Sequence, residues 1–193
     1  MLILASASPR RRELLSRVGV PFAVAPADVD ETPAPGEAPV PYVERIAAAK
    51  AAVHPEPEDW VLAADTTVTI DGAILGKAAD ADEAAAMLRQ LRGRTHQVVT
   101  AVVLRHGDDV RAVTVTSDVE MTDFADELLD DYVASNEWHG KAGAYAVQGI
   151  AAALVRGIRG SITNVVGLPL AEVIELLRAT GAAPVRLAHG HPS

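Results

Sequence analysis

The order of apolar and polar residues along the chain predicts short strands that alternate with amphipathic helices. Apolar runs of strand length are predicted at 2–5, 22–25, 60–64, 68–70, 73–75, 97–105, 110–121 and 152–158. Apolar residues at helical spacing predict helices within 9–18, 43–50, 81–92 and 170–177, and an exposed acidic helix is expected within 118–131. Ser8 and Asp80 are suited to cap helices, and Asp71-Gly72 predicts a hairpin turn.

Strands and helices alternate, but two predicted hairpins interrupt the alternation. This order predicts an α/β protein with a mixed sheet rather than a purely parallel one. A length of 193 residues fits one large domain or two small lobes. We expect a single domain over 1–183, a long Pro-rich loop over 26–41 and a mobile tail over 184–193.

Composition and charge exclude several classes of protein. With 49% hydrophobic and 22% charged residues, the chain has ordinary globular usage. A formal net charge of −9 argues against an extended nucleic-acid partner. No apolar run reaches the ~18 residues that a membrane helix needs, so we expect no membrane partner. The chain has no cysteine, which excludes disulfides and thiol catalysis, and a cytoplasmic protein is expected.

The segment Ser6-x-Ser8-Pro9-Arg10-Arg11 joins the first predicted strand to the first helix. Free backbone N–H groups at a helix start favour anions. Arginines in a first turn oppose the helix dipole, so a helix that contains them there is a candidate anion site. The alternative is a capped surface helix whose arginines are solvated.

Two acidic residues are candidates for metal binding or proton transfer. Asp65 follows five apolar residues, so we expect it at the carboxyl end of a strand, where ligand crevices open in α/β sheets. A carboxylate there could hold a metal or activate water, or it could merely cap a turn through Thr67. Glu31, in the Pro-rich loop over 26–41, is a weaker candidate because that loop contains several acidic residues.

Only three of the 17 basic residues are lysines, and each is a candidate for a specific role: Lys50, Lys77 and Lys141. Lys77 follows Gly76, which permits close backbone approach to a ligand. Lys50 is expected late in a helix, where a base also interacts favourably with the dipole without any ligand. His96 is interpreted as structural, because no second histidine stands at metal-ligand spacing.

The chain resembles the Maf family of nucleoside triphosphate pyrophosphatases. Six motifs carry the resemblance, in the family's order: Ala5–Arg11, Ala64–Thr66, Gly76-Lys77, Gly93–Val98, Gly140–Gly149, and Gly160-Ser161 with Asn164–Leu170. Ala64-Asp65-Thr66 with Gly143–Gly149 is similar to the branch acting on dTTP and UTP. Two residues depart from the family pattern. The family usually has proline at the position of Ala78, and it often has an aromatic residue at the position of Ile162.

The resemblance implies a two-lobed fold with an elongated mixed sheet, a central cleft and a homodimer. It implies hydrolysis of a nucleoside triphosphate to the monophosphate and pyrophosphate, with Asp65 as proton acceptor and Mg²⁺ or Mn²⁺ near Asp65 and Glu31. It also implies two sets of substrate-binding positions. Those that set substrate choice are Arg10, Thr66 and Gln148, and those around the phosphates are Ser8, Arg11, Lys50 and Lys77.

Two other functions remain open at this point. One is a nucleotide-binding regulator of cell division and septum formation, which would need the arginines but not Asp65. The other is a pyrophosphatase for modified purine triphosphates.

Overall fold

The computed structural model describes residues 1–53 and 58–186. In this part of the chain, a seven-stranded mixed sheet has the order β2-β1-β3-β5-β6-β7, and β4 pairs with β3. The strands are β1 (Leu2–Leu4), β2 (Ala23–Val24), β3 (Trp60–Ile70), β4 (Ala73–Leu75), β5 (Thr95–His106), β6 (Asp109–Met121) and β7 (Val155–Arg159). Pairs β1–β2 and β1–β3 are parallel and the others antiparallel, which confirms the predicted mixed α/β fold.

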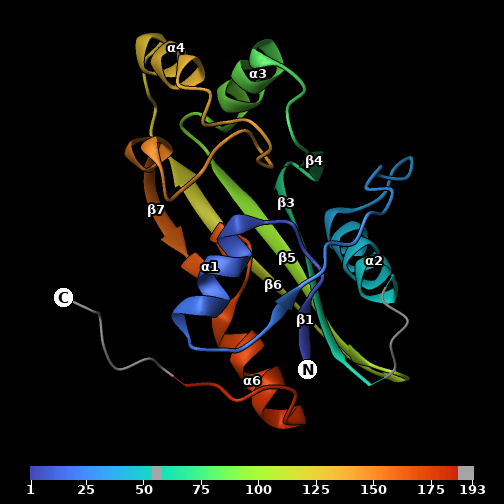
Figure 1. Cartoon of the computed structure of the whole chain (residues 1–193). Coiled ribbons are helices and arrows are strands. Elements are labelled where there is room, and N and C mark those ends of the chain that lie inside the picture. Colours follow the sequence, from blue (N-terminus) through green and yellow to red (C-terminus); the bar gives the residue numbers. More distant parts are fainter. Residues whose placement is uncertain (54–57, 187–193) are drawn as a thin grey trace, which may run out of the picture.

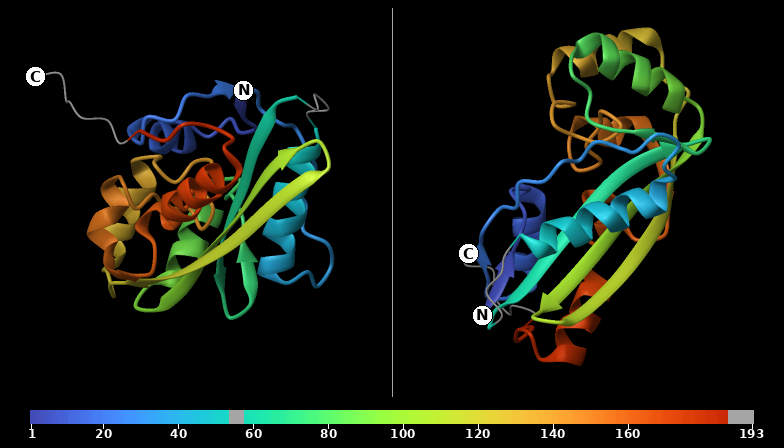
Figure 2. Two further views of the ribbon diagram at one scale, coloured as in Figure 1. Left: turned by 90° about the horizontal axis from the view of Figure 1, so that it is seen from below. Right: turned by 90° about the vertical axis from the view of Figure 1, so that its right-hand side faces the viewer.

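Helices cover both faces of this sheet and one end of it (Figure 1). They are α1 (Pro9–Arg17), α2 (Pro39–Ala52), α3 (Ala81–Leu91), α4 (Asp126–Ala134), α5 (Ile162–Val166) and α6 (Leu170–Thr180). The sheet separates α2 from α1 and α6 (Figure 2). Alternate residues of β3 fill the two faces, because Leu62 and Ala64 pack with α1 and α6 while Val61 and Ala63 pack with α2.

A third apolar cluster lies at the end of the sheet that carries α3 and α4 (Figure 1). Val68 of β3 and Val98 of β5 reach into it. The long central strands therefore run from the part of the molecule around α1, α2 and α6 to the part around α3 and α4. Among the described residues, no helix is both long and apolar enough to cross a membrane.

Local capping signals agree with the sequence. The Ser8 hydroxyl accepts a bond from the backbone N–H of Arg11, and the Asp80 carboxylate accepts one from that of Glu83. Pro39 begins α2 inside the predicted loop, since the first helical turn does not need the missing N–H.

Two expectations about the elements are wrong. The runs at 60–64 and 68–70 form one strand, β3, because β-branched residues between them continue its pairing with β5. The strand expected over 152–158 begins only at Val155, after a 3₁₀ helix (Ile150–Leu154). The mobile tail expected over 184–193 stays a prediction, because residues 187–193 lie outside the described residues; Val185, within that range, packs against the cluster around α1 and α6.

A gap in strand pairing along one edge of β3 positions the site. Strand β1 ends at Leu4, opposite Leu62, and β4 joins the same edge only at Val68. Among the described residues, no strand pairs with this edge over 63–67. The chain leaves β1 at this gap and continues into the turn before α1.

Candidate active site

A cavity of about 510 Å³ lies at this gap. It is lined by the turn after β1, the middle of β3 and the segment 139–148. The nine site residues that the family resemblance implies all line it: Ser8, Arg10, Arg11, Glu31, Lys50, Asp65, Thr66, Lys77 and Gln148. Segments far apart in the sequence thus bring the candidate residues into one cavity.

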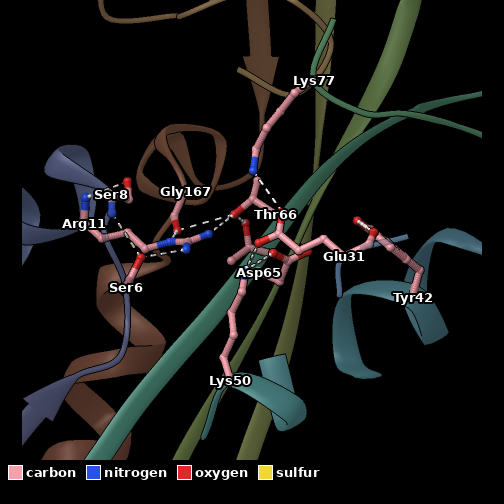
Figure 3. A network of polar contacts seen from close by, with 11 residues as sticks. Ser6, Ser8, Arg11, Glu31, Tyr42, Lys50, Asp65, Thr66, Lys77 and Gly167 are labelled. Carbon is pink, nitrogen blue, oxygen red and sulfur yellow. Dashed lines mark hydrogen bonds and ion pairs between the residues drawn. The ribbon is translucent and has the colours of Figure 1, made fainter. Parts of the chain in front are cut away.

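Two lysines and two carboxylates form an alternating chain of charges on one side of the cavity (Figure 3). Lys50 Nζ lies 2.7 Å from Asp65 Oδ1 and 2.7 Å from Glu31 Oε1. Lys77 Nζ lies 2.8 Å from the other oxygen of Glu31. The Lys50 and Asp65 side chains are buried, so their attraction is little screened by water.

These contacts show that Lys50 does more than interact with the dipole of its helix. It lies in the last turn of α2, as expected for a base that interacts with the helix dipole. Its side chain nevertheless points into the protein and joins Asp65 to Glu31. The interpretation that its helical position alone explains Lys50 is therefore wrong.

This charge cluster shifts the pKa values of Glu31 and Tyr42. Burial raises the pKa of Glu31, but the hydrogen bonds and charges of Lys50 and Lys77 outweigh it and lower that pKa to about 2. Burial, together with the negative charges of Asp65 and Glu31, raises the pKa of Tyr42 to about 12. The Tyr42 hydroxyl therefore stays protonated and donates to the backbone carbonyl of Glu31 at 2.9 Å, which ties the Pro-rich loop to α2.

Thr66 follows Asp65 and points to the opposite face of β3, toward α1 (Figure 3). There Arg11 makes three hydrogen bonds. Its Nε donates to the Gly167 carbonyl at 2.7 Å, its Nη1 to Ser6 Oγ at 3.1 Å and its Nη2 to Thr66 Oγ1 at 2.9 Å. Burial lowers the pKa of Arg11, and the charge of Asp65 opposes that shift.

The solvated-arginine alternative is therefore wrong for Arg11, which is buried, whereas Arg12 is exposed. The network continues beyond Thr66. Thr66 Oγ1 lies 2.9 Å from Thr100 Oγ1, which donates to the carbonyl of Asn164. These bonds join α1, β3, β5 and α5 around the cavity.

Asp65 is not at the carboxyl end of its strand, and that expectation is wrong. It lies in the middle of β3, opposite Ala101 of β5. It nevertheless borders a crevice, because the parallel neighbour β1 ends beside it. The carboxyl end that opens the crevice is thus that of β1.

Among the described residues, Asp65 and Glu31 are the acidic side chains that line this cavity and could hold a metal. Among the described residues, no cluster of three or more histidine or acidic side chains could hold an ion by itself. Hard cations such as Mg²⁺ use carboxylate oxygens and are commonly held by one or two carboxylates plus substrate phosphates. The two carboxylates joined by Lys50 fit such a substrate-completed site and do not fit an all-protein cage.

The segment 139–148 closes the cavity from the side of Lys77. Lys77 and Ala142 form an antiparallel bridge, and the N–H of Gly143 donates to the carbonyls of Leu75 and Gly76. Gln148 is exposed at the cavity. His96, expected to be structural, is buried, and its Nε2 lies 2.8 Å from the hydroxyl of Tyr145.

A family model described as Maf-like protein matches residues 1–180. The chain belongs to the Maf family. It is 55% identical over 189 residues to the dTTP/UTP pyrophosphatase of Cereibacter sphaeroides, which covers 97% of this chain and 98% of that protein. Proteins of the same name from Roseobacter denitrificans and Anaeromyxobacter dehalogenans are 50% and 49% identical, over 94% and 93% of this chain and 97% and 94% of their own lengths.

The two departures from the Maf pattern lie at different depths in the structure. Ala78 is buried in the cluster around α3 and α4. Ile162 is 60% exposed at the start of α5, so the missing aromatic residue leaves no opening in the core. The bridge between Lys77 and Ala142 holds the backbone beside Ala78 without the usual proline.

Sequence reasoning missed several polar residues that shape this Maf site. Ser6 and Thr100 are buried, and both bond within the Arg11 and Thr66 network. Asn164 is fully buried and donates to the carbonyl of Val98 and to Ser117. Ser6 and Asn164 do stand in the quoted motifs, but their partners lie elsewhere in the chain and give no local signal.

Proposed function

We propose that this chain is a nucleotide pyrophosphatase that hydrolyses dTTP and UTP to the nucleoside monophosphate and pyrophosphate. The observation that carries the proposal is the buried Asp65 carboxylate held by Lys50 in a cavity rich in cations. The names of relatives about 50% identical over nearly the whole chain support the same substrates.

In this proposal, Asp65 accepts the proton of the attacking water. Lys50 positions the carboxylate, since its ammonium lies 2.7 Å from Asp65 Oδ1. Lys77, Arg10 and Arg11, which line the cavity, neutralise phosphoryl oxygens, as phosphoryl transfer requires mainly positioning and charge stabilisation.

We propose that Asp65 and Glu31 hold a divalent cation, Mg²⁺ or Mn²⁺, which when bound would offset phosphate charge. Lys50 contacts both carboxylates, so few protein ligands are left for an ion without substrate. We therefore expect weak Mn²⁺ binding to the free protein and much tighter binding with a non-hydrolysable dTTP analogue. Equally tight Mn²⁺ binding with and without the analogue, measured by titration calorimetry, would contradict this site.

The decisive experiment compares Asp65→Asn with wild type on a panel of pyrimidine and purine triphosphates, measuring pyrophosphate release. Loss of the proton acceptor should lower kcat about 10²–10⁴-fold. Asp71→Asn is the matched control, because Asp71 is exposed and pairs with Arg94 outside the cavity. Turnover by Asp65→Asn within about threefold of wild type would refute the role of Asp65.

The same panel separates the alternatives. A nucleotide-binding regulator of septum formation would bind triphosphates without releasing pyrophosphate, and Asp65→Asn would leave that binding intact. A pyrophosphatase for modified purines would turn those substrates over faster than dTTP and UTP.

We also propose a homodimer that acts in the cytoplasm, where nucleotide pools are found. Among the described residues, β7 pairs with β6 only from Asp118 onward, and the preceding outer edge of β6 has no strand partner. Light scattering should give twice the 20.2 kDa chain mass, and a monomer mass would contradict the dimer. Cell fractionation tests the compartment.

A further inference from the structure

Lys141 is the one lysine that the proposed mechanism does not use, yet it lines the same cavity. It is partly buried, and its ammonium donates a 3.3 Å hydrogen bond to the carbonyl of His139. Within the described residues, its side chain has no carboxylate partner. The cavity also contains Arg10, whose guanidinium likewise has neither a hydrogen bond nor an ion pair within those residues.

The backbone around Lys141 is held firmly against the rest of the site. Its neighbour Ala142 forms the bridge to Lys77. Gly143 adopts φ +65°, and a Cβ there would lie 2.9 Å from side-chain carbons of Val68. The segment can therefore approach β3 this closely only with glycine, and this approach fixes where Lys141 leaves the backbone.

The charges near Lys141 indicate an anion. Burial lowers the pKa of Lys141, and the nearby positive charge of Arg10 lowers it further, while Glu137 opposes the shift. The Glu137 carboxylate, however, accepts bonds from the backbone N–H groups of Ile150 and Ala151. Among the described residues, two like charges thus face one cavity without an ion-pair partner, an arrangement that an anionic ligand would stabilise.

We propose that Lys141 is a substrate-binding residue that, with Arg10, forms a second cationic wall of the cavity and contacts phosphoryl oxygens of the bound triphosphate. This inference rests on the proposed function and extends it. It separates two sets of cations. Lys50 and Lys77 are already paired with Glu31 and Asp65, whereas Arg10 and Lys141 are free to meet the negative charge of the ligand.

The test measures the binding of inorganic tripolyphosphate with Mg²⁺ by calorimetry and kcat/KM for dTTP. Lys141→Met keeps a long unbranched side chain and removes the charge, and should weaken tripolyphosphate binding and lower kcat/KM about 10- to 100-fold. Lys141→Arg should stay within about fivefold of wild type, because the charge is retained. Lys141→Gln repeats the charge removal should the methionine variant fold poorly.

Arg12→Met is the matched control, because it removes one positive charge from the exposed side of α1, outside the cavity. It should bind tripolyphosphate as wild type does, within about twofold. A similar loss in Arg12→Met and Lys141→Met would indicate general electrostatics and overturn the specific contact.

Three other results would overturn the proposal: no tripolyphosphate binding by wild type, unchanged binding by the charge-removing variants, or a changed preference between dTTP and CTP with unchanged tripolyphosphate binding. The last would mean that Lys141 faces the base. Should wild type bind tripolyphosphate but hydrolyse no triphosphate, the proposed function would fail, and the binding measurements would still decide the role of Lys141.

Discussion

Replacing Arg11 by alanine should destabilise the protein as well as weaken triphosphate binding. The guanidinium is buried and donates to Gly167, Ser6 and Thr66, and so ties α1 to β3 and to the turn between α5 and α6. Arg10, its neighbour, lines the same cavity without such bonds to the described residues. Arg11 therefore supports the structure in a way that Arg10 does not, although both arginines line the cavity.

The size of the effect follows from the three bonds. Hydrogen bonds to a charged group each contribute about 1.5–3 kcal/mol. The sum overstates the loss, because alanine also removes the desolvation cost of the guanidinium. In addition, two of the acceptors keep a second partner, the Ser8 N–H for Ser6 and Thr100 for Thr66. The Gly167 carbonyl keeps only a longer 3.4 Å contact with the Thr66 hydroxyl, whose single proton Thr100 also attracts. We expect a decrease of about 2–3 kcal/mol in the free energy of unfolding.

Urea unfolding measures this value: the midpoint concentration should fall, while the slope of the free energy of unfolding against urea concentration stays the same. For a chain of this length the same loss lowers Tm by about 5–10 °C. Arg10→Ala should change the free energy of unfolding by less than about 0.5 kcal/mol. An Arg11→Ala protein as stable as Arg10→Ala would refute the reasoning, since the three bonds would then contribute nothing net to folding.

The remaining predictions concern base choice, pH and the cavity wall. Gln148→Ala should lower turnover of dTTP and UTP and shrink the preference over CTP, because the amide matches the uracil edge; an equal decrease for all three would assign Gln148 to loop support. Burial lowers the pKa of His96 from 6.5 to about 4, so protonation favours unfolding, and the free energy of unfolding should fall by about 3 kcal/mol between pH 6.5 and 4. His96→Gln should remove that pH dependence, and parallel profiles for the two proteins would contradict it. Gly143→Ala should lower the free energy of unfolding by about 1–3 kcal/mol, because the added Cβ would lie too close to Val68. Gly140 also has a positive φ of +70° but has open space around it, so Gly140→Ala should lower the free energy of unfolding by only about 1 kcal/mol. Equal denaturation midpoints for the two alanine variants would refute the contact with Val68.

Helix ends marked by capping residues could be predicted from the sequence, whereas the extent of a strand that depends on pairing with a distant strand could not. Ser8 and Asp80 cap helices where expected, because a cap needs only residues three positions apart. The continuation of β3 past Asp65 depends on β5, which lies some 30 residues further along the chain. Helix α5 was not predicted, although Ser161 caps it and Gly167 ends it, because five residues carry no periodicity.

The site shows the same division. Family motifs gave residues that the structure brings into one cavity, including Gln148, far from Asp65 in the sequence. Neither motifs nor spacing could show that Lys50 bridges two carboxylates or that Arg11 is held by protein acceptors. Such contacts depend on how β3 presents Asp65 to α2 and Thr66 to α1, and only the pairing of the sheet fixes that.

The distribution of charge explains how an acidic protein could select a small polyanion. The chain has a formal net charge of −9, which repels long nucleic acids. Among the described residues that line the cavity, five are lysine or arginine and two are aspartate or glutamate, which gives 5 − 2 = +3. A cleft lined mainly by charges of one sign focuses its electric field on a ligand that is small enough to enter. Because Glu31 and Asp65 already neutralise Lys50 and Lys77, the remaining +3 lies with Arg10, Arg11 and Lys141. That side of the cavity should orient the phosphate chain.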